Sequence, residues 1–285
     1  MNKFFLKNMF NISKCPVIDF NLGDISQKAQ KLTNKLSISG VQPKLSVKLD
    51  KKQNMLIPVA EGGEYILKPQ TSTFPNIPEN EQCCMNIAKE LGVDVPLNCL
   101  IPLKDKSWAY IVKRFDREKD VKIHQEDFAQ ILGESDKYKG SVEQIGRKLK
   151  EVSSAPGYDC QLFFERVVLN FILGNGDGHL KNYSISYIDK DNVRLAPAYD
   201  IVCSKLVIFD EEDSALTING KKNKLQREDF DDFAEYLNVP VKIRYEKFEN
   251  KFNVIETIIR SSRLDKEKQA RFVEIIKERI NCLTE

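Results

Sequence analysis

Three polar residues in the second half of the chain have the types and the spacing that phosphoryl transfer requires. Asp177 and Asn182 lie five residues apart in one glycine-rich segment, and Asp200 follows a strand-like stretch. Transfer of a phosphoryl group needs a carboxylate that accepts the proton of the attacking hydroxyl, together with oxygen ligands for Mg²⁺. We therefore predict that Asp177 is the general base and that Asn182 and Asp200 bind magnesium.

The interval of five residues is the one that protein kinases use between the catalytic Asp and a metal-binding Asn. The alternative is a polar surface turn, because Asn-Gly and Asp-Gly pairs are common in turns. His179 fits a positioning residue of this loop better than a metal ligand, and we place it among the catalytic and the nucleotide-binding candidates. Lys181 is a catalytic candidate that could neutralise the transferred phosphate or hold Asp177, and a solvated lysine is its alternative.

A lysine in the first half of the chain ends an apolar strand-like segment, Tyr65-Ile-Leu-Lys68. Kinases hold the nucleotide phosphates with such a lysine and orient it with a glutamate from a helix. Glu81, at the start of the next helix, is the predicted partner of Lys68, with Glu79 and Glu90 as alternatives. An ordinary solvated lysine is the other interpretation.

The segment before the first strand could cover the phosphates with backbone N–H groups. It has a single glycine, so it is neither a Walker A loop nor a G-x-G-x-x-G loop, and an ordinary turn is the alternative. Serine hydroxyls near a γ-phosphate could themselves be phosphorylated, and the added charge would repel the loop from the phosphates. The candidate phosphate-binding residues are Ser39, Gly40, Val41, Gln42 and Lys44, and the candidate autophosphorylation sites are Ser37 and Ser39.

Arg114, Phe115 and Asp116 fall where a β-rich half of the chain meets a helical half, and we place them near the nucleotide. A hinge that reads adenine does so mainly through backbone groups, so the side chains alone say little. Asp127 opens a helix and is predicted as its N-cap.

The pattern of apolar residues predicts an α+β fold with a β-rich lobe and a helical lobe. Together with the kinase-type spacing of Asp177 and Asn182, this predicts a two-lobed, protein-kinase-like fold. Strands are predicted at 46–49, 55–59, 65–68, 97–102 and 108–115, with a helix at 80–91. Helices are predicted at 127–132, 142–152, 159–173, 229–237, 241–261 and 266–282, with a hairpin at 183–195. Residues 1–115 would form a small β-rich N-terminal lobe and residues 116–285 a mainly helical C-terminal lobe, a frame that suits a nucleotide held between lobes.

The composition narrows the class of protein. The chain has 285 residues, 41% of them hydrophobic, and a formal net charge of +2. This charge is too small to indicate nucleic-acid or membrane binding in bulk. We find no secretory signal and no stretch near the roughly 20 apolar residues of a membrane span. Seven scattered cysteines without a Cys-x-x-Cys pair are typical of reduced thiols in a cytoplasmic protein, and with only two histidines a zinc site is not expected.

Taken in order, these motifs resemble the HipA-like serine/threonine kinases, the toxins of bacterial toxin–antitoxin modules. The resemblance runs from about Ser37 to the C-terminus. It rests on the following motifs: Ser-Ile-Ser-Gly-Val-Gln-Pro-Lys44, Ile-Leu-Lys68-Pro, Glu79-Asn-Glu81, Arg114-Phe-Asp-Arg117, Gln125-Glu-Asp-Phe128, Asp177-Gly-His-Leu-Lys-Asn182 and Pro197-Ala-Tyr-Asp200.

The resemblance implies binding of ATP with Mg²⁺, with Lys68 on the phosphates and Arg114 and Phe115 near adenine. Members of the family autophosphorylate a serine of the glycine-rich loop, which ejects the loop and inactivates the kinase. Ser37 matches the usual position, and the second serine, Ser39, gives a pattern that resembles the short HipT branch.

The family's targets are aminoacyl-tRNA synthetases, glutamyl for HipA and tryptophanyl for HipT, and the short N-terminus favours the tryptophanyl enzyme. The expected partners are a HipB-like DNA-binding antitoxin, through which any contact with DNA would be indirect, and a HipS-like small protein. Lys113 stands where the HipA type has an acidic hinge residue. Two other functions stay open: an atypical lipid or small-molecule kinase, and a non-catalytic antitoxin-binding module.

Overall fold

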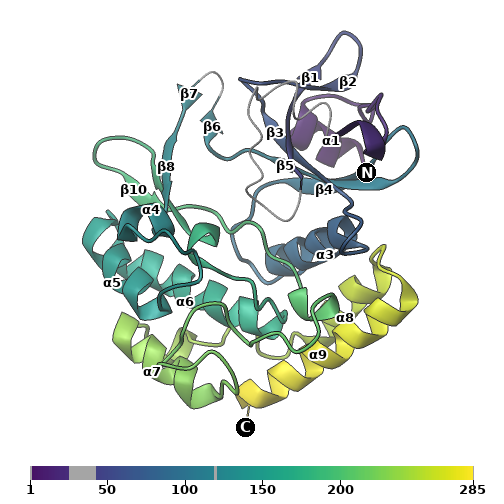
Figure 1. The fold of residues 1–285 in the computed structure, drawn as a ribbon. Helices are drawn as coiled ribbons and strands as arrows, with labels where there is room; N and C mark the ends of the chain where they lie inside the picture. The colour runs from purple at the N-terminus through teal and green to yellow at the C-terminus, as the bar shows by residue number, and fades with distance from the viewer. Residues whose placement is uncertain (1, 26–42, 119–120, 285) are drawn as a thin grey trace. The chain divides into compact units, whose positions relative to one another are not determined.

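A computed structural model describes residues 2–25, 43–118 and 121–284. The chain forms two compact units, the first made of Met1–Gln82 with Pro96–Arg117 and the second of Cys83–Val95 with Glu118–Glu285. The first unit contains a five-stranded sheet, and the second is mainly helical (Figure 1). The α+β class predicted from the sequence is confirmed. None of the helices in the described parts of the chain is long and apolar enough to span a membrane.

The sheet of the first unit has the strand order β2-β1-β3-β5-β4, with antiparallel neighbours throughout. Alternate residues of β1, namely Leu45, Val47 and Leu49, point into the core, as a strand with one buried face requires. All five strands lie in segments where the sequence predicts strands. They are β1 (Leu45–Asp50), β2 (Met55–Pro58), β3 (Tyr65–Pro69), β4 (Asn98–Pro102) and β5 (Trp108–Lys113).

A helix that the sequence left unassigned, α1 (Lys3–Phe10), packs against this sheet (Figure 1). The side chain of Asn2 caps its N-terminus by accepting a hydrogen bond from the N–H of Phe5 at 2.8 Å. Its buried face contributes Leu6, Met9 and Phe10 to the core of the unit. At eight residues, the helix is too short for its period to stand out in the sequence.

Helix α3 (Ile77–Glu90) starts three residues before the predicted position and ends one residue before the predicted end at 91. Gly92 terminates it in the left-handed conformation, with φ of 73°, and the N–H of Val93 closes the last turn on the carbonyl of Ala88 at 2.9 Å. The helix contributes its residues up to Gln82 to the first unit and those from Cys83 to the second.

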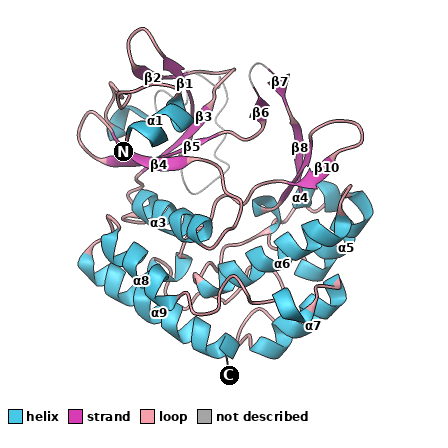
Figure 2. Cartoon of the chain, turned by 180° about the vertical axis from the view of Figure 1, so that it is seen from behind, coloured by secondary structure: helices cyan, strands magenta, loops and turns pink. Residues whose placement is uncertain are grey.

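Helix α6 lies at the centre of the second unit and packs against α5, α7 and α9 (Figure 2). Eleven of its residues are buried, and eight of these are apolar, as expected of a helix at the centre of a core. The helices of this unit after α3 are α4 (Phe128–Leu132), α5 (Val142–Val152), α6 (Pro156–Ile172), α7 (Arg227–Leu237), α8 (Phe252–Ser261) and α9 (Lys266–Thr284).

A three-stranded antiparallel sheet of order β10-β9-β8 lies beside these helices. The predicted hairpin is present as β9 (Ser184–Tyr187) and β10 (Val193–Leu195). Residues 124–126, which were not predicted as a strand, pair with β9 in β8 (His124–Asp127). Asp127 ends β8 and caps α4 by accepting the N–H of Gln130 at 2.9 Å, so its prediction as an N-cap is confirmed. Two short strands, β6 (Arg117–Glu118) and β7 (Val121–Lys122), precede this sheet.

The predicted long helix over 241–261 is wrong in its first half. Residues Val241–Ile243 form a single 3₁₀ turn, and a helix begins only at Phe252. The guanidinium of Arg244 donates to the carbonyl of Val239 and to Asp231, each at 3.2 Å, which turns the chain back onto α7. Asn250 has a φ of 56°, a conformation that a helix interior excludes.

Candidate active site

The first unit holds a buried ion pair between Lys68 and Glu81. Strand β3 places Lys68 near its end, and the first turns of α3 place Glu81 opposite, with Nζ 2.7 Å from Oε1. Both residues are almost fully buried, at 8% and 1% exposure. The neighbouring strand adds the ring of Tyr110, whose centroid is 5.7 Å from the ammonium. Glu81, which the sequence favoured over Glu79 and Glu90, is therefore the glutamate that contacts Lys68.

Burial of this pair has a cost that its own attraction barely offsets, because two charges lose their hydration. A protein that needed only stability at this position would gain as much from apolar side chains. A lysine held by a glutamate is the arrangement that kinases use to present an ammonium to the nucleotide phosphates.

The Arg114–Arg117 segment folds upon itself through its charged side chains. Arg114 donates two hydrogen bonds to the carboxylate of Asp116, at 2.8 and 2.6 Å, and Arg117 donates a third. Burial alone would raise the pKa of Asp116, but the hydrogen bonds and positive charges of these arginines hold it below its usual value. Phe115, the residue after Arg114 in the sequence, is half-buried. A nucleotide role for Arg114, Phe115 and Asp116 stays a prediction.

Most of the predicted phosphate-covering loop lies outside the described residues. This applies to Ser37, Ser39, Gly40, Val41 and Gln42. Lys44 is described, and it is exposed just before β1. Its nucleotide role also stays a prediction.

The predicted catalytic loop of the second unit begins where α6 ends. Gly174 takes a φ of 66°, which ends the helix in the conformation that suits glycine. A Cβ atom on Gly176 would lie 2.4 Å from the carbonyl oxygen of Glu212 and 2.6 Å from the Glu211 carboxyl carbon, so only glycine fits there. One of the loop's glycines is thus required for its backbone angle and another for the space it leaves.

Asp177 projects from this loop and is half-buried. Its Oδ1 accepts a hydrogen bond from the hydroxyl of Tyr138 at 2.7 Å. No other described residue donates a side-chain hydrogen bond to the carboxylate, so Oδ2 is left for another donor. The pKa of Tyr138 is raised, by burial first and then by its bond to Asp177, which keeps the phenol protonated.

Asn182 locks the loop in a tight turn. Its Oδ1 accepts the backbone N–H of His179 at 2.9 Å, and the same N–H lies 2.8 Å from the carbonyl of Asp177. An amide oxygen has two lone pairs, so the one that His179 leaves free can bind a cation. The backbone N–H of His179 therefore joins Asp177 and Asn182 within one turn.

His179 is buried and neutral. Its Nε2 lies 2.8 Å from the Nζ of Lys137, and since an ammonium has only donors, Nε2 is the acceptor and Nδ1 carries the proton. Burial lowers the pKa of His179 and the charge of Lys137 lowers it further, while Asp177 and Asp200 oppose both. Within the described chain nothing accepts the proton on Nδ1.

Asp200 lies beyond β10 in the left-handed region, with a φ of 59°. A non-glycine residue in this conformation is uncommon and is often found at functional sites. Asp200 is half-buried and close enough to His179 to raise the pKa of the imidazole. Lys181, in contrast, is exposed, and its ammonium makes no hydrogen bond or ion pair within the described parts of the chain.

The two predicted metal ligands have the oxygen donors that suit a magnesium ion, and their role stays a prediction. Asn182 and Asp200 offer oxygen atoms, which Mg²⁺ prefers, and no described group of three or more His, Cys, Asp or Glu residues forms a complete cage for a metal. Mg²⁺ usually takes one or two carboxylates and completes its octahedron with substrate phosphates and water.

Sequence reasoning missed the residues that hold the loop from outside. Lys137 and Tyr138 come from the segment before α5, about 40 residues away in sequence. On another side, the hydroxyl of Ser204 accepts the N–H of Gly176 at 2.8 Å and donates to Glu211 at 2.5 Å. Burial raises the pKa of Glu211, and the charge of Asp177 adds to the effect. No local pattern marks any of these residues.

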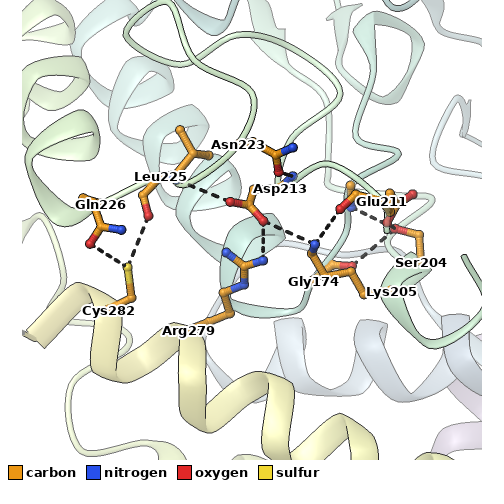
Figure 3. A network of polar contacts seen from close by, with 11 residues as sticks. Gly174, Ser204, Lys205, Glu211, Asp213, Asn223, Leu225, Gln226, Arg279 and Cys282 are labelled. Atoms are coloured by element: carbon orange, nitrogen blue, oxygen red, sulfur yellow. Dashed lines mark hydrogen bonds and ion pairs between the residues drawn. The ribbon is translucent and has the colours of Figure 1, made fainter. Parts of the chain in front are cut away.

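From Glu211 the polar contacts continue to the C-terminal helix (Figure 3). Lys205 bonds the carbonyl of Glu211 at 2.7 Å and lies 3.3 Å from the carboxylate of Asp213. Asp213 also pairs with Arg279 of α9, whose guanidinium lies 4.4 Å from the centroid of Phe171 in α6. The catalytic loop is thereby connected to the helical core.

Comparisons with known proteins identify the family of this chain. The family model of HipA-like C-terminal domains matches residues 36–277. A protein of Sinorhizobium fredii named "Putative kinase Y4dM" is 39% identical over 206 residues, which are 66% of this chain and 50% of that protein. The serine/threonine-protein kinase toxin HipA of Shewanella oneidensis is 27% identical over 210 residues, 66% of this chain and 47% of the toxin. The chain thus spans about half the length of these curated relatives.

Two solved structures share the fold. The Shewanella oneidensis HipA in a complex with HipB and operator DNA superposes with a TM-score of 0.71 at 20% identity, over 96% of this chain and 72% of that one. The Helicobacter pylori proinflammatory kinase CtkA gives a TM-score of 0.56 at 18% identity, over 76% of this chain and 84% of that one. The chain therefore has an α+β kinase-like fold.

Proposed function

Because this chain belongs to the family of HipA-like C-terminal domains, we propose that it is an ATP-dependent protein serine/threonine kinase. The buried pair of Lys68 and Glu81, 2.7 Å apart, carries the proposal. Burial of the pair costs stability, and a strand lysine held by a helix glutamate is the arrangement with which kinases bind the nucleotide phosphates.

In the proposed reaction each residue has one task. Lys68 holds the phosphates of ATP and Glu81 orients Lys68. Asp177 accepts the proton of a serine hydroxyl through the oxygen that Tyr138 leaves open. Asn182 and Asp200 hold Mg²⁺, which when bound neutralises charge on the phosphates. His179 stays neutral and keeps the loop turned.

We further propose that the kinase is the toxin of a bacterial toxin–antitoxin module. Support comes from the relative named as a HipA toxin and from the solved HipA in complex with HipB and operator DNA. On this basis the partners would be a HipB-like antitoxin and a HipS-like protein, with an aminoacyl-tRNA synthetase as substrate, the tryptophanyl enzyme before the glutamyl one. Phosphorylation of the substrate would inhibit translation.

The proposed kinase would also phosphorylate itself on Ser37, on Ser39 or on both. Both serines stand in the sequence segment that precedes β1, where Ser39 is itself one of the residues proposed to cover the phosphates and Ser37 lies two positions before it. A phosphate there would repel the nucleotide and switch the enzyme off.

The test is to incubate the purified protein with Mg·ATP and to measure its intact mass and phosphopeptides, alone and with tryptophanyl- or glutamyl-tRNA synthetase. Lys68→Met is expected to abolish transfer. Lys104→Met, which removes an exposed lysine of the same unit, is expected to behave like the wild type. Transfer to phosphoinositide vesicles without transfer to protein would instead favour a lipid kinase, and no transfer at all would contradict the proposal.

A further inference from the structure

Two consecutive side chains of the segment between α4 and α5 form hydrogen bonds to the predicted catalytic loop. The hydroxyl of Tyr138 binds Oδ1 of Asp177 at 2.7 Å, and the ammonium of Lys137 binds Nε2 of His179 at 2.8 Å. The backbone takes part as well, because the N–H of Leu180 donates to the carbonyl of Lys137 at 3.1 Å. Three successive contacts thus connect this segment to residues 177–180.

The side chains of Lys137, Tyr138 and His179 also pack against one another. The ring of Tyr138 meets the imidazole of His179 edge-on, with centroids 5.4 Å apart at 80°. The ammonium of Lys137 lies 4.7 Å from the centroid of the Tyr138 ring. A cation over an aromatic face and an edge-to-face ring pair are both favourable geometries. Each member is therefore positioned by two others.

The segment itself is anchored from both sides. The N–H of Tyr138 donates to the carboxylate of Asp136 at 2.9 Å, and the ammonium of Lys222 donates to the carbonyl of Tyr138 at 3.4 Å. Two residues further, the carbonyl of Gly140 accepts the N–H of Thr217 at 3.2 Å. A side chain on such a backbone can fix the group it touches.

We propose that Lys137 and Tyr138 are positioning residues of the proposed kinase reaction, Tyr138 for the Asp177 carboxylate and Lys137 for the His179 ring. Tyr138 occupies one carboxylate oxygen and so directs the other toward the acceptor hydroxyl. Lys137 holds the imidazole ring in one orientation and one tautomer, while the backbone N–H of His179 donates to Asn182. The assignment rests on the proposed function.

The same hydrogen bond between Tyr138 and Asp177 is also compatible with an opposite role for Tyr138. A hydroxyl bound to the general base could stand where the acceptor hydroxyl must bind, and Tyr138 would then block the site. The two roles predict opposite changes in rate when the hydroxyl is removed, so one substitution separates them.

The decisive experiment compares Tyr138→Phe with Tyr236→Phe in steady-state phosphoryl transfer from Mg·ATP. Tyr236 is a matched control, since it is 43% exposed against 42% for Tyr138, also lies under a lysine ammonium at 5.4 Å, and touches no carboxylate within the described chain. Tyr138→Phe is expected to lower kcat roughly 10- to 100-fold, the effect of one hydrogen bond to a charged group, with KM for ATP unchanged. Tyr236→Phe is expected to match the wild type.

A double-mutant cycle tests whether Tyr138 acts through Asp177. In the Asp177→Asn background, Tyr138→Phe is expected to change the residual rate less than about two-fold, because the group it positions is already gone. An independent, multiplied loss would overturn the assignment. So would a faster Tyr138→Phe enzyme, or one with wild-type kcat.

Thermal melting separates folding from positioning. Tyr138→Phe is expected to melt with the wild type, and Lys137→Met, which removes the other contact, is expected to lower kcat in the same direction. Active wild-type protein with an unchanged Tyr138→Phe would overturn this assignment and leave the kinase proposal intact. Wild-type protein that transfers no phosphate would overturn both.

Discussion

The two ends of helix α6 each present an aspartate, and the structure treats the two carboxylates differently. Asp159, in the first turn, is fully buried and accepts hydrogen bonds from Ser153, from the Arg194 guanidinium and from the N–H of Leu195. Asp177, just past the last turn, is half-buried and accepts a side-chain bond only from Tyr138 among the described residues. A carboxylate whose lone pairs are all occupied stabilises the fold, whereas one held by a single oxygen keeps the other for chemistry.

The two carboxylates also differ in whether a cation contacts them. Arg194 lies directly on Asp159, at 2.8 Å, and with the hydrogen bonds offsets the cost of burying the charge. Asp177 has a neutral phenol as its nearest donor instead. A cation in direct contact would reduce the basicity of a carboxylate that has to accept a proton. The comparison therefore indicates a stabilising role for Asp159, and it agrees with the proposal that Asp177 is the general base.

The largest expected effect is that of Asp177→Asn on the rate. Loss of a general base is expected to lower phosphoryl transfer about 10²- to 10⁴-fold. The amide can still accept the hydrogen bond from Tyr138, so the melting temperature should stay that of the wild type. Rapid quench with radiolabelled ATP measures the first quantity and calorimetry the second. A stable variant with full activity would remove Asp177 from the mechanism.

Asp159→Asn should produce the opposite result. The substitution leaves Arg194 beside a neutral group and removes part of the acceptor capacity, so a loss of about 3 kcal/mol in the free energy of unfolding is expected. Urea titration at 15 °C measures this loss. Activity per folded molecule should not change. Asp191→Asn, in an exposed turn, is the control and should leave the stability unaffected.

A smaller effect is expected from alanine substitutions of the glycines at the two ends of α6, Gly157 and Gly176. A Cβ on Gly176 would collide with the backbone of Glu212, so Gly176→Ala should cost about 1–3 kcal/mol and slow the reaction as the loop shifts. Gly157, in the first turn of α6, has no atom within 4 Å of its added Cβ, and Gly157→Ala should stabilise the protein by about 0.4–1 kcal/mol. Equal effects of the two variants would show that the loop is not tightly packed.

The smallest expected effect is on the pH dependence of stability, through the polar contacts of Asp213 with Arg279 and Lys205 (Figure 3). Burial would raise the pKa of Asp213, but Arg279 and Lys205 together hold it below its usual value. A depressed folded pKa stabilises the protein fully above the unfolded value of about 3.9, and this contribution disappears as the pH falls through the folded pKa. The stability difference between wild type and Asp213→Asn should therefore shrink below about pH 4 in urea titrations. A constant difference down to pH 3 would contradict the assignment.

Local patterns in the sequence determined most of the elements of this protein. Helix α5 occupies the predicted residues 142–152, and the strands of the first unit lie in the predicted segments. Periodicity and capping are local properties, which is why Asp127 could be assigned as an N-cap in advance. The contact between Lys68 and Glu81 was accessible because a lysine at a strand end and a glutamate in the next helix are only 13 residues apart.

Only the tertiary structure decided which groups complete the catalytic loop. Tyr138 lies 39 residues from Asp177 and Lys137 lies 42 from His179, and no spacing rule connects such positions. The chain turn at Arg244 likewise depends on contacts with another element, which local propensity cannot foresee. The sequence by itself determined the chemical groups and the elements that carry them, because these follow from neighbouring residues. The orientation of those groups was decided by long-range packing, because each is fixed by side chains from distant parts of the chain.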